Sequence, residues 1–188
     1  FHSTVRPVPL EIQMHGFDNP SFKANILAMN KLILYSISNH AEDKPVIIYV
    51  PSRRLCRSLA SDIIIHSNAE QTPRRYMHVP VQELQPLLEK VSSSALRECL
   101  SLGVGFFHEA LTDMDKQVVF SLFKSGAIQI IIVSQALVWE MPTSAHLVIV
   151  MGTQYYEGKE SRYVDYPITT VLRMIGRAGR PGVDDSAK

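Results

Sequence analysis

Four short apolar runs constrain the fold of this chain more than any other feature of its sequence. They cover residues 46–50, 104–107, 128–133 and 146–151. Each has the length of a strand, and a run that is almost wholly apolar is typical of a strand buried on both faces. Because the segments between the runs carry helical patterns, we predict an α/β fold with a parallel sheet covered by helices on both faces.

Apolar residues at three- and four-residue steps predict the helices between these strands. Pro20 suits the first position of a helix, where its missing N–H is not needed, and Thr112 with Asp115 resembles a capping box. An extended segment or edge strand, interrupted by Pro7 and Pro9, is expected before the first helix. The helices are expected from about Pro20, over 54–65, in two short stretches between 81 and 102, from Thr112, and over 168–176.

The length of the chain, 188 residues, fits a single lobe. We therefore treat residues 1–188 as one domain and expect them to be a piece of a longer polypeptide. Residues 67–102 begin with a polar, proline-bearing stretch and continue into two short helices. An insertion or helical excursion is expected there.

The charge balance limits how this chain can bind nucleic acid. Its formal net charge is +1, whereas a protein that grips a duplex over a wide face usually has a clear basic excess. Any RNA contact is therefore expected to be local, at a few loops. Cys56 and Cys99 are too few for a metal framework, so no metal is expected and a reducing compartment is the default. No apolar run reaches the roughly 20 residues of a membrane-spanning helix.

Ligands of a parallel sheet meet the loops at the carboxyl ends of its strands. The first loop holds Ser52 and Arg53, which can hold a backbone phosphate or can be a helix cap and a solvated arginine. His108 follows the second strand, where a structural, hydrogen-bonded histidine is the alternative. Ser134 begins the third loop, in which Trp139 is expected to plug the core.

The fourth loop, from Gly176 to Pro181, carries Arg177 and Arg180 among glycines. The two arginines are three residues apart and are expected to point one way from a compact backbone. They could complement the negative pole of the preceding helix, for a few tenths of a kcal/mol each. They could instead bring positive charge to a transferring phosphoryl group, where an arginine finger raises the rate about 10³–10⁵-fold. The glycine-rich setting favours the second interpretation.

These loops resemble those of a helicase family. Ser52-Arg53, His108-Glu109-Ala110, the loop from Ser134 to His146, and the run from Arg173 to Pro181 fall in the order of motifs IV, IVa, V and VI of the superkiller-type (Ski-like) DExH-box RNA helicases of superfamily 2. The resemblance spans nearly the whole chain. It implies a RecA-like parallel sheet, related to the phosphate-loop NTPases, that forms the second lobe of such a helicase.

The same resemblance implies roles for individual residues. Arg177 and Arg180 would be catalytic arginine fingers, Gly176 and Arg173 would lie at the nucleotide, and RNA would be contacted by Ser52, Arg53, His108 and Ser134. ATP and Mg²⁺ would be held mainly by a first RecA lobe outside these residues, because the chain has neither a phosphate-binding loop nor a DExH box. The chain alone is therefore expected to hold no cofactor tightly.

A narrower resemblance joins the chain to the two-cassette spliceosomal branch of the family, in particular to its C-terminal cassette. It is carried by residues 125–129, 145–149, 153–156 and 163–168. It implies a nuclear ATP-dependent RNA helicase that unwinds the U-four/U-six duplex, with RNA, the first RecA lobe, the neighbouring cassette and other spliceosomal proteins as partners. The activating-signal cointegrator branch shares much of this sequence and is an alternative.

The chain also departs from the family pattern. Glu109 stands in a motif that reads His-His-Ala-Gly in active members, Glu140 and Pro142 replace glycine and asparagine in motif V, and Arg173 replaces the glutamine that opens motif VI. A carboxylate repels phosphate, and proline removes a backbone donor, so weakened RNA coupling is expected. A protein-docking and regulatory platform is therefore the alternative function. An unrelated parallel α/β domain with a chance arginine pair is the remaining one.

Overall fold

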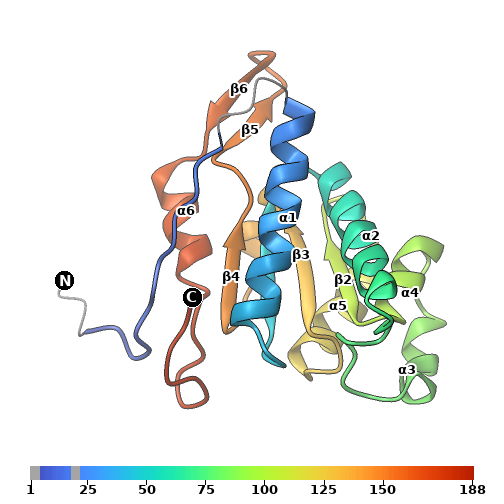
Figure 1. Cartoon of the computed structure of the whole chain (residues 1–188). Helices are drawn as coiled ribbons and strands as arrows, with labels where there is room; N and C mark the ends of the chain where they lie inside the picture. Colours follow the sequence, from blue (N-terminus) through green and yellow to red (C-terminus); the bar gives the residue numbers. More distant parts are fainter. Residues whose placement is uncertain (1–4, 18–21) are drawn as a thin grey trace.

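The four apolar runs form one parallel sheet. In the computed structural model, which describes residues 5–17 and 22–188, the strands are β1 (Val46–Val50), β2 (Val104–Phe107), β3 (Ile130–Ser134) and β4 (Leu147–Val150). They lie in the order β2-β3-β1-β4, all parallel (Figure 1). The predicted α/β class with a RecA-like parallel sheet is confirmed.

The sheet is held by burial of its own side chains. Every residue of β1, β2 and β3 is buried, and fully burying a Val or Ile side chain stabilises a fold by about 1.5–3 kcal/mol. A strand that is apolar on both faces needs cover on both faces. The helices provide that cover.

The helices follow the predicted order with shifted ends. They are α1 (Phe22–His40), α2 (Arg53–Ala69), α3 (Val81–Leu88), α4 (Ser94–Leu100), α5 (Asp113–Lys124) and α6 (Ile168–Ile175), with a 3-10 helix η2 (Gln135–Glu140). The expected start at Pro20 lies outside the described residues. Helices α1 and α2 lie together on one face (Figure 1). Right-handed crossovers place α5 on the other face, because the chain reverses its direction along the sheet at β2.

The start of α5 shows half of the predicted capping box. Thr112 caps the helix, since its Oγ1 accepts a hydrogen bond from the backbone N–H of Asp115 at 3.1 Å. The reciprocal bond is absent among the described contacts, because the buried carboxylate of Asp115 accepts from the backbone N–H of Ser92 at 2.7 Å instead. Asp115 therefore ties the loop before α4 to α5.

Residues 67–102 pack into the same core as the sheet. Their buried side chains include Tyr76, Leu84, Leu88, Leu96 and Leu100. Gly103 follows this segment directly with a φ of +86°, and a Cβ there would lie 2.1 Å from the carbonyl carbon of Tyr76. Only glycine fits so close an approach of two backbones. Whether the segment is an insertion relative to a simpler lobe stays a prediction.

Both ends of the described chain cover the edge strand β4. The backbone N–H of Val148 donates to the carbonyl oxygen of Lys188 at 2.8 Å, and Leu10 forms an isolated parallel bridge with Ala187. The expected N-terminal strand is therefore reduced to one bridge. This arrangement satisfies backbone groups that an exposed edge would offer to other chains.

A buried ion pair fixes the segment after α6. The side chain of Asp184 has 0% exposure and accepts from the Nε of Arg180 at 2.8 Å, from its Nη2 at 2.7 Å and from its backbone N–H at 3.0 Å. The Nδ1 of His146 lies 3.4 Å from the same carboxylate. The hydrogen bonds from Arg180 lower the pKa of Asp184, and burial lowers that of His146.

A two-stranded hairpin rises beyond the carboxyl end of β4. Strands β5 (Gln154–Glu157) and β6 (Arg162–Asp165) pair antiparallel at the top of Figure 1. The sequence pattern did not predict this hairpin. Among the described residues, no helix has the length and hydrophobicity needed to cross a bilayer.

Removal of the Asp184 charge should destabilise the fold in a pH-dependent way. We expect Asp184→Asn to lower the free energy of unfolding at pH 7 by about 1.5–3 kcal/mol, the usual range for hydrogen bonds to a charged group. Because the folded pKa is lowered, this contribution is present above the unfolded pKa of about 3.9 and is lost as the pH falls through the folded pKa. Urea denaturation from pH 7 to pH 3 measures the difference. The exposed neighbour variant Asp185→Asn is the control, and an equal effect of both variants would contradict the prediction.

Gly103 and Gly126 form a matched pair for a second stability test. Both have positive φ, but a Cβ on Gly126 would meet nothing within 4 Å. We expect Gly126→Ala to cost about 1 kcal/mol, the strain of a left-handed residue. Gly103→Ala should cost clearly more or prevent folding, because backbone atoms of Tyr76 cannot move aside. Thermal unfolding of both variants measures the order, and equal midpoints would contradict the close approach.

Candidate functional site

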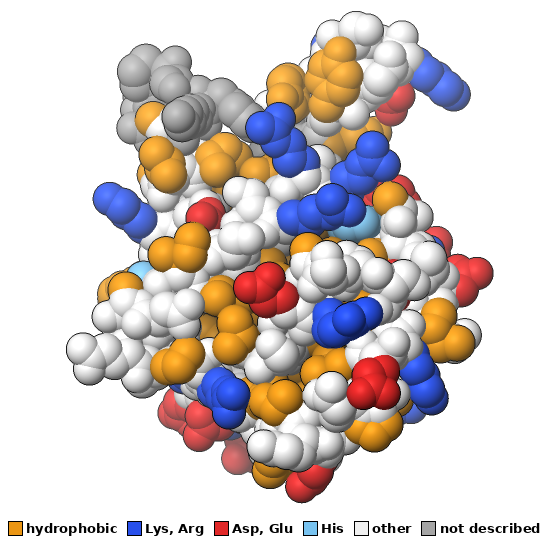
Figure 2. Space-filling view, turned by 90° about the vertical axis from the view of Figure 1, so that its right-hand side faces the viewer, with side chains coloured by type: hydrophobic (Ala, Val, Ile, Leu, Met, Phe, Trp, Pro, Cys, Tyr) orange, Lys and Arg blue, Asp and Glu red, His pale blue; other side chains and the backbone are white. Residues whose placement is uncertain are grey.

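Ser52 and Arg53 lie exposed at the carboxyl end of β1, as the sequence predicts. Ser52 caps α2, and its Oγ accepts a hydrogen bond from the backbone N–H of Leu55 at 3.4 Å. The simpler interpretation of this serine, as a helix cap, is therefore present in the structure. Arg53, Arg54 and Arg57 are all exposed on the first turns of α2. The face drawn in Figure 2 has several basic side chains near its top, and side chains of both charges lie lower on the same face.

His108 lies inside the molecule instead of on its surface. Its exposure is 0%, and its ring stacks on Phe106 with 5.5 Å between the ring centroids. The backbone N–H of Ala110 donates to Nδ1 at 3.2 Å, and the Nε of Arg57 approaches Nε2 at 3.4 Å. Burial, followed by the charge of Arg57, lowers the pKa of His108. The expectation of a direct RNA contact by His108 does not fit this placement, because stacking and burial hide the ring.

Ser134 is also enclosed, and its hydroxyl already has a partner. Its Oγ donates to the Oε2 of Glu109 at 2.9 Å, and the residue is only 1% exposed. Glu109 itself is exposed. A phosphate that approached Ser134 would therefore meet the Glu109 carboxylate first. The expected RNA contact by Ser134 is blocked in this conformation, because a negative side chain takes the position of the ligand.

Trp139 does not plug the core as the sequence suggested. Its side chain lies on η2 and is 58% exposed. The Cζ of Arg173 lies 4.1 Å from the centre of the indole ring, and its Nη2 donates to the carbonyl oxygen of Trp139 at 3.3 Å. A cation over an exposed aromatic ring stabilises the contact by about 0.5–1 kcal/mol. Arg173 thereby joins motif VI to motif V.

Arg177 lies just beyond α6 and next to β4. The carbonyl oxygen of Arg177 accepts from the backbone N–H of Ala145 at 2.9 Å, which fixes the backbone. Its half-buried guanidinium makes no hydrogen bond or ion pair with any residue that the structure describes. Gly176 closes α6 and is exposed. A positioned guanidinium with unused donors can receive an anion.

Arg180 points to a different part of the lobe. It lines a hollow together with Pro45, Gly126 and Ser144, residues that precede β1, β3 and β4. The amino ends of the strands meet there, opposite the rim where ligands of such sheets bind. The expectation that both arginines point one way is wrong, because the buried Asp184 carboxylate draws Arg180 aside.

Four functional candidates were not predicted from the sequence. Asp184 could have been found from its position four residues after Arg180. Tyr156 and Tyr163 on the hairpin are 56% and 53% exposed, with ring centroids 5.5 Å apart in an edge-on arrangement. The local sequence did not indicate that the buried Tyr49 would lie close enough to Arg173 and Arg177 for their charges to act on its hydroxyl. That proximity depends on the packing of α6.

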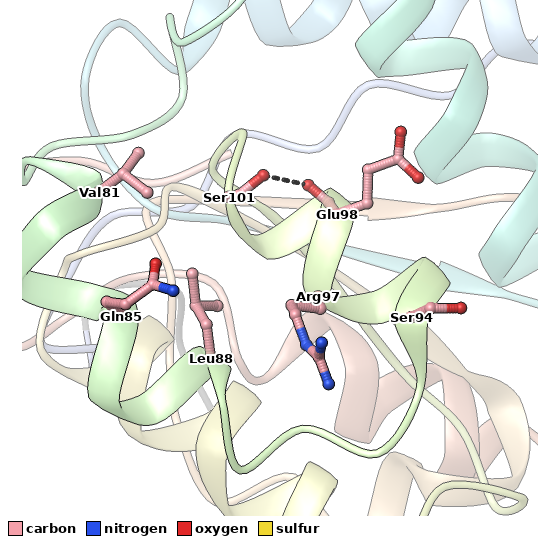
Figure 3. Close-up of a pocket in the computed structure, with 7 residues that line it drawn as sticks. All are labelled: Val81, Gln85, Leu88, Ser94, Arg97, Glu98 and Ser101. Carbon is pink, nitrogen blue, oxygen red and sulfur yellow. Dashed lines mark hydrogen bonds between the residues drawn. The ribbon is translucent and has the colours of Figure 1, made fainter.

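A second hollow lies between α3 and α4 (Figure 3). Its Arg97 donates to the carbonyl oxygen of Val91 at 2.6 Å, and the Oγ of Ser101 donates to that of Glu98 at 2.7 Å. These polar groups are already used within the chain, so the hollow offers little to a ligand. Its lining consists of Val81, Gln85, Leu88, Ser94, Arg97, Glu98 and Ser101.

Neither metal ligands nor reactive thiols gather in the described part of the chain. No group of three or more His, Cys, Asp or Glu residues is placed to hold a metal ion within the described ranges. Cys56 and Cys99 are buried as free thiols. Burial raises the pKa of Cys56 to about 12 and that of Cys99 to about 11, so both are protonated at neutral pH.

The chain is similar to curated RNA helicases over its whole length, although no family model matches it. It is 46% identical over 188 residues to the human U5 small nuclear ribonucleoprotein 200 kDa helicase, covering 100% of the chain and 9% of that relative. It is 42% identical over 191 residues to the Arabidopsis thaliana DExH-box ATP-dependent RNA helicase DExH12, of which it covers 9%. It is 42% identical over 188 residues to zebrafish (Danio rerio) activating signal cointegrator 1 complex subunit 3, of which it covers 12%.

The chain thus spans about a tenth of the length of these relatives. The similarity reaches both the spliceosomal and the cointegrator branch, and both include the segment from motif IV to motif VI. With 42–46% identity along the entire chain and a RecA-like sheet, the chain belongs to the superkiller-type DExH-box RNA helicase family, as a relative of the U5 helicase.

Proposed function

We propose that this chain is the second RecA-like lobe of an ATP-dependent RNA helicase of pre-mRNA splicing, acting in the nucleus. The parallel sheet, the order of motifs IV to VI, and the 46% identity to a U5 helicase support this assignment. In the whole protein, the substrate would be the U-four/U-six duplex. Its partners would be the first RecA lobe, the neighbouring cassette and other spliceosomal proteins.

The proposed contact with the nucleotide rests on the unpaired guanidinium of Arg177. The carbonyl oxygen of Arg177 accepts from the backbone N–H of Ala145, just before β4, while its guanidinium donors have no partner among the described residues. Such a group can approach a phosphoryl group held elsewhere, and stabilise the charge that develops during transfer. ATP and Mg²⁺ would be held mainly by the first lobe. Arg180 would contribute by fixing the loop through Asp184, unless that pair opens.

The RNA half of the proposal uses the carboxyl rim of the sheet. Ser52 and Arg53 are exposed there and can contact a phosphate. His108 and Ser134 would act from behind them, as positioning residues. The exposed rings of Tyr156 and Tyr163, on the hairpin above the rim, offer faces on which bases can stack.

A protein-docking and regulatory platform is the second candidate function. The contact between Ser134 and Glu109 favours it, because the carboxylate takes a donor that RNA would otherwise use. Glu140 adds a second negative charge, which the Lys116 ammonium neutralises only in part from 3.9 Å. The cointegrator-type helicase is the alternative within the family, since its similarity to the chain is nearly as high.

The catalytic proposal is tested by Arg177→Ala in the full-length parent protein. We expect RNA-stimulated ATP hydrolysis to fall about 10³-fold or more, as for the loss of an arginine finger. Steady-state phosphate release measures the effect, and Arg75→Ala, remote from the rim, is the control. Unchanged turnover in the Arg177 variant would reject the role of Arg177 as an arginine finger.

Micromolar binding of ATP to this chain alone, measured by calorimetry, would contradict the assignment of the nucleotide to the first lobe.

The carboxylate of Glu109 should suppress RNA binding. We expect Glu109→Ala to bind a single-stranded oligoribonucleotide about tenfold more tightly than the unaltered chain, because like charges at close range cost about 1–4 kcal/mol. Fluorescence anisotropy at fixed salt measures the affinity. Glu98→Ala, an equal charge change on α4, is the control. If neither variant gains affinity, the platform function is supported over the RNA-binding one.

A further inference from the structure

Arg6 lies far from motif VI in the sequence, yet its side chain contacts the loop that follows α6. Its Nη2 donates to the carbonyl oxygen of Ala178 at 2.5 Å and to that of Ile175 at 3.4 Å. These two carbonyl groups lie on either side of Arg177 in the chain. The N-terminal segment runs beside α6 (Figure 1), so the contact joins residues 172 positions apart.

The end of a helix favours a cation at this place. Helix α6 ends at Ile175, and the last carbonyl groups of a helix carry its negative pole. An arginine that donates to such carbonyl groups satisfies them and complements the pole. Arg6 is half-buried, so water competes less for its hydrogen bonds than it would at an exposed position.

Apolar packing holds the backbone near Arg6 against the same loop. Val8 is buried in a small cluster with Ala178 and Ala187. Gly179 permits this approach, because its φ is +90° and a Cβ on it would lie 3.0 Å from the Cβ of Val8. The N-terminal segment is therefore held in place by packing that does not depend on the guanidinium of Arg6.

Arg177 is held from a second direction by the loop before β4. The backbone N–H of Ala145 donates to the carbonyl oxygen of Arg177 at 2.9 Å, and the N–H of Gly179 donates to the carbonyl oxygen of Ala145 at 2.7 Å. Together with the two bonds from Arg6, these contacts fix the backbone before, at and after Arg177. Its guanidinium, by contrast, makes no hydrogen bond or ion pair within the described part of the chain.

We propose that Arg6 is a positioning residue, which holds the loop so that the guanidinium of Arg177 lies at the phosphoryl group. The inference rests on the proposed function of Arg177, and it adds a residue that lies outside motifs IV to VI. A group that stabilises developing charge must be in place before the charge develops. A displacement of about 1 Å, caused by a change remote from the chemistry, can lower a rate about 10²-fold. Arg6 itself contacts neither nucleotide nor RNA in this assignment.

Steady-state ATP hydrolysis by the full-length parent protein tests the proposed role. We expect Arg6→Ala to lower the RNA-stimulated kcat about 10- to 100-fold with little change in the KM for ATP, because a misplaced finger stabilises the transition state less. Arg6→Lys should restore much of the rate. A single nitrogen of Arg6 makes both bonds, so the Nζ of lysine can replace it.

Arg97→Ala is the matched control. Arg97 also donates to a backbone carbonyl oxygen, that of Val91, at 2.6 Å. It lies on α4, which packs on β2, at the opposite edge of the sheet from β4 and α6. The kcat of Arg97→Ala should stay within about twofold of the unaltered protein, because distant sites act independently.

A double substitution separates positioning from a loss of stability. In the Arg177→Ala background, Arg6→Ala should change kcat by less than about twofold, because residues that act as a unit are not additive. A merely structural role would lower kcat by the same factor in both backgrounds, and would overturn the proposal. Hydrogen exchange of the full-length protein, followed by mass spectrometry, gives a second readout. Exchange over residues 176–181 should be faster in Arg6→Ala and unaltered in Arg97→Ala, and equal exchange in both variants would overturn the proposal as well.

The single variants distinguish the failure of this inference from the failure of the proposed function. A loss of hydrolysis in Arg177→Ala, with an unaltered rate in Arg6→Ala, would overturn the positioning role and keep Arg177 as the finger. An unaltered rate in Arg177→Ala would reject the proposed function, and the positioning role with it.

Discussion

The burial of β1 on both faces is the constraint on which the rest of the structure depends. Its five side chains are buried, and it pairs with β3 on one side and β4 on the other. A central strand of this kind requires parallel neighbours and helices on both faces. It also brings the loops after β1, β2 and β3 to one rim. Each candidate RNA contact at that rim follows from this arrangement.

The charges at this rim then decide which of its residues can bind a phosphate. Ser134 has the chemistry to bind a phosphate, but Glu109 holds its hydroxyl at 2.9 Å. The basic first turns of α2 remain exposed nearby. At this rim, the Glu109 carboxylate and a phosphate ligand would therefore compete for the same hydrogen-bond donors. The acidic residue at position 109 thereby limits the access of a phosphate to Ser134, which itself matches the family pattern.

The three arginines of motif VI have different environments, because each makes different tertiary contacts. Arg180 is committed to a buried carboxylate, Arg173 lies over an exposed indole ring, and Arg177 keeps its donors unused. Salt-bridged guanidinium groups fix a backbone, whereas unpaired ones can receive a ligand. Of the three, only Arg177 therefore keeps all of its guanidinium donors available. The spacing of three residues between Arg177 and Arg180 did not reveal this division.

The sequence by itself determined the class of fold, because apolar runs such as residues 46–50 and 104–107, alternating with helical segments, are typical of a parallel sheet covered on both faces. It also placed Ser52 and Arg53 correctly at a strand end, since a loop position follows directly from the end of a strand. The tertiary structure alone decided that His108 and Ser134 are hidden, that Trp139 is exposed, and that Arg180 turns away. Those outcomes depend on contacts between residues distant in the chain, such as Arg173 with Trp139 and Ser134 with Glu109, and local patterns carry no information about such contacts.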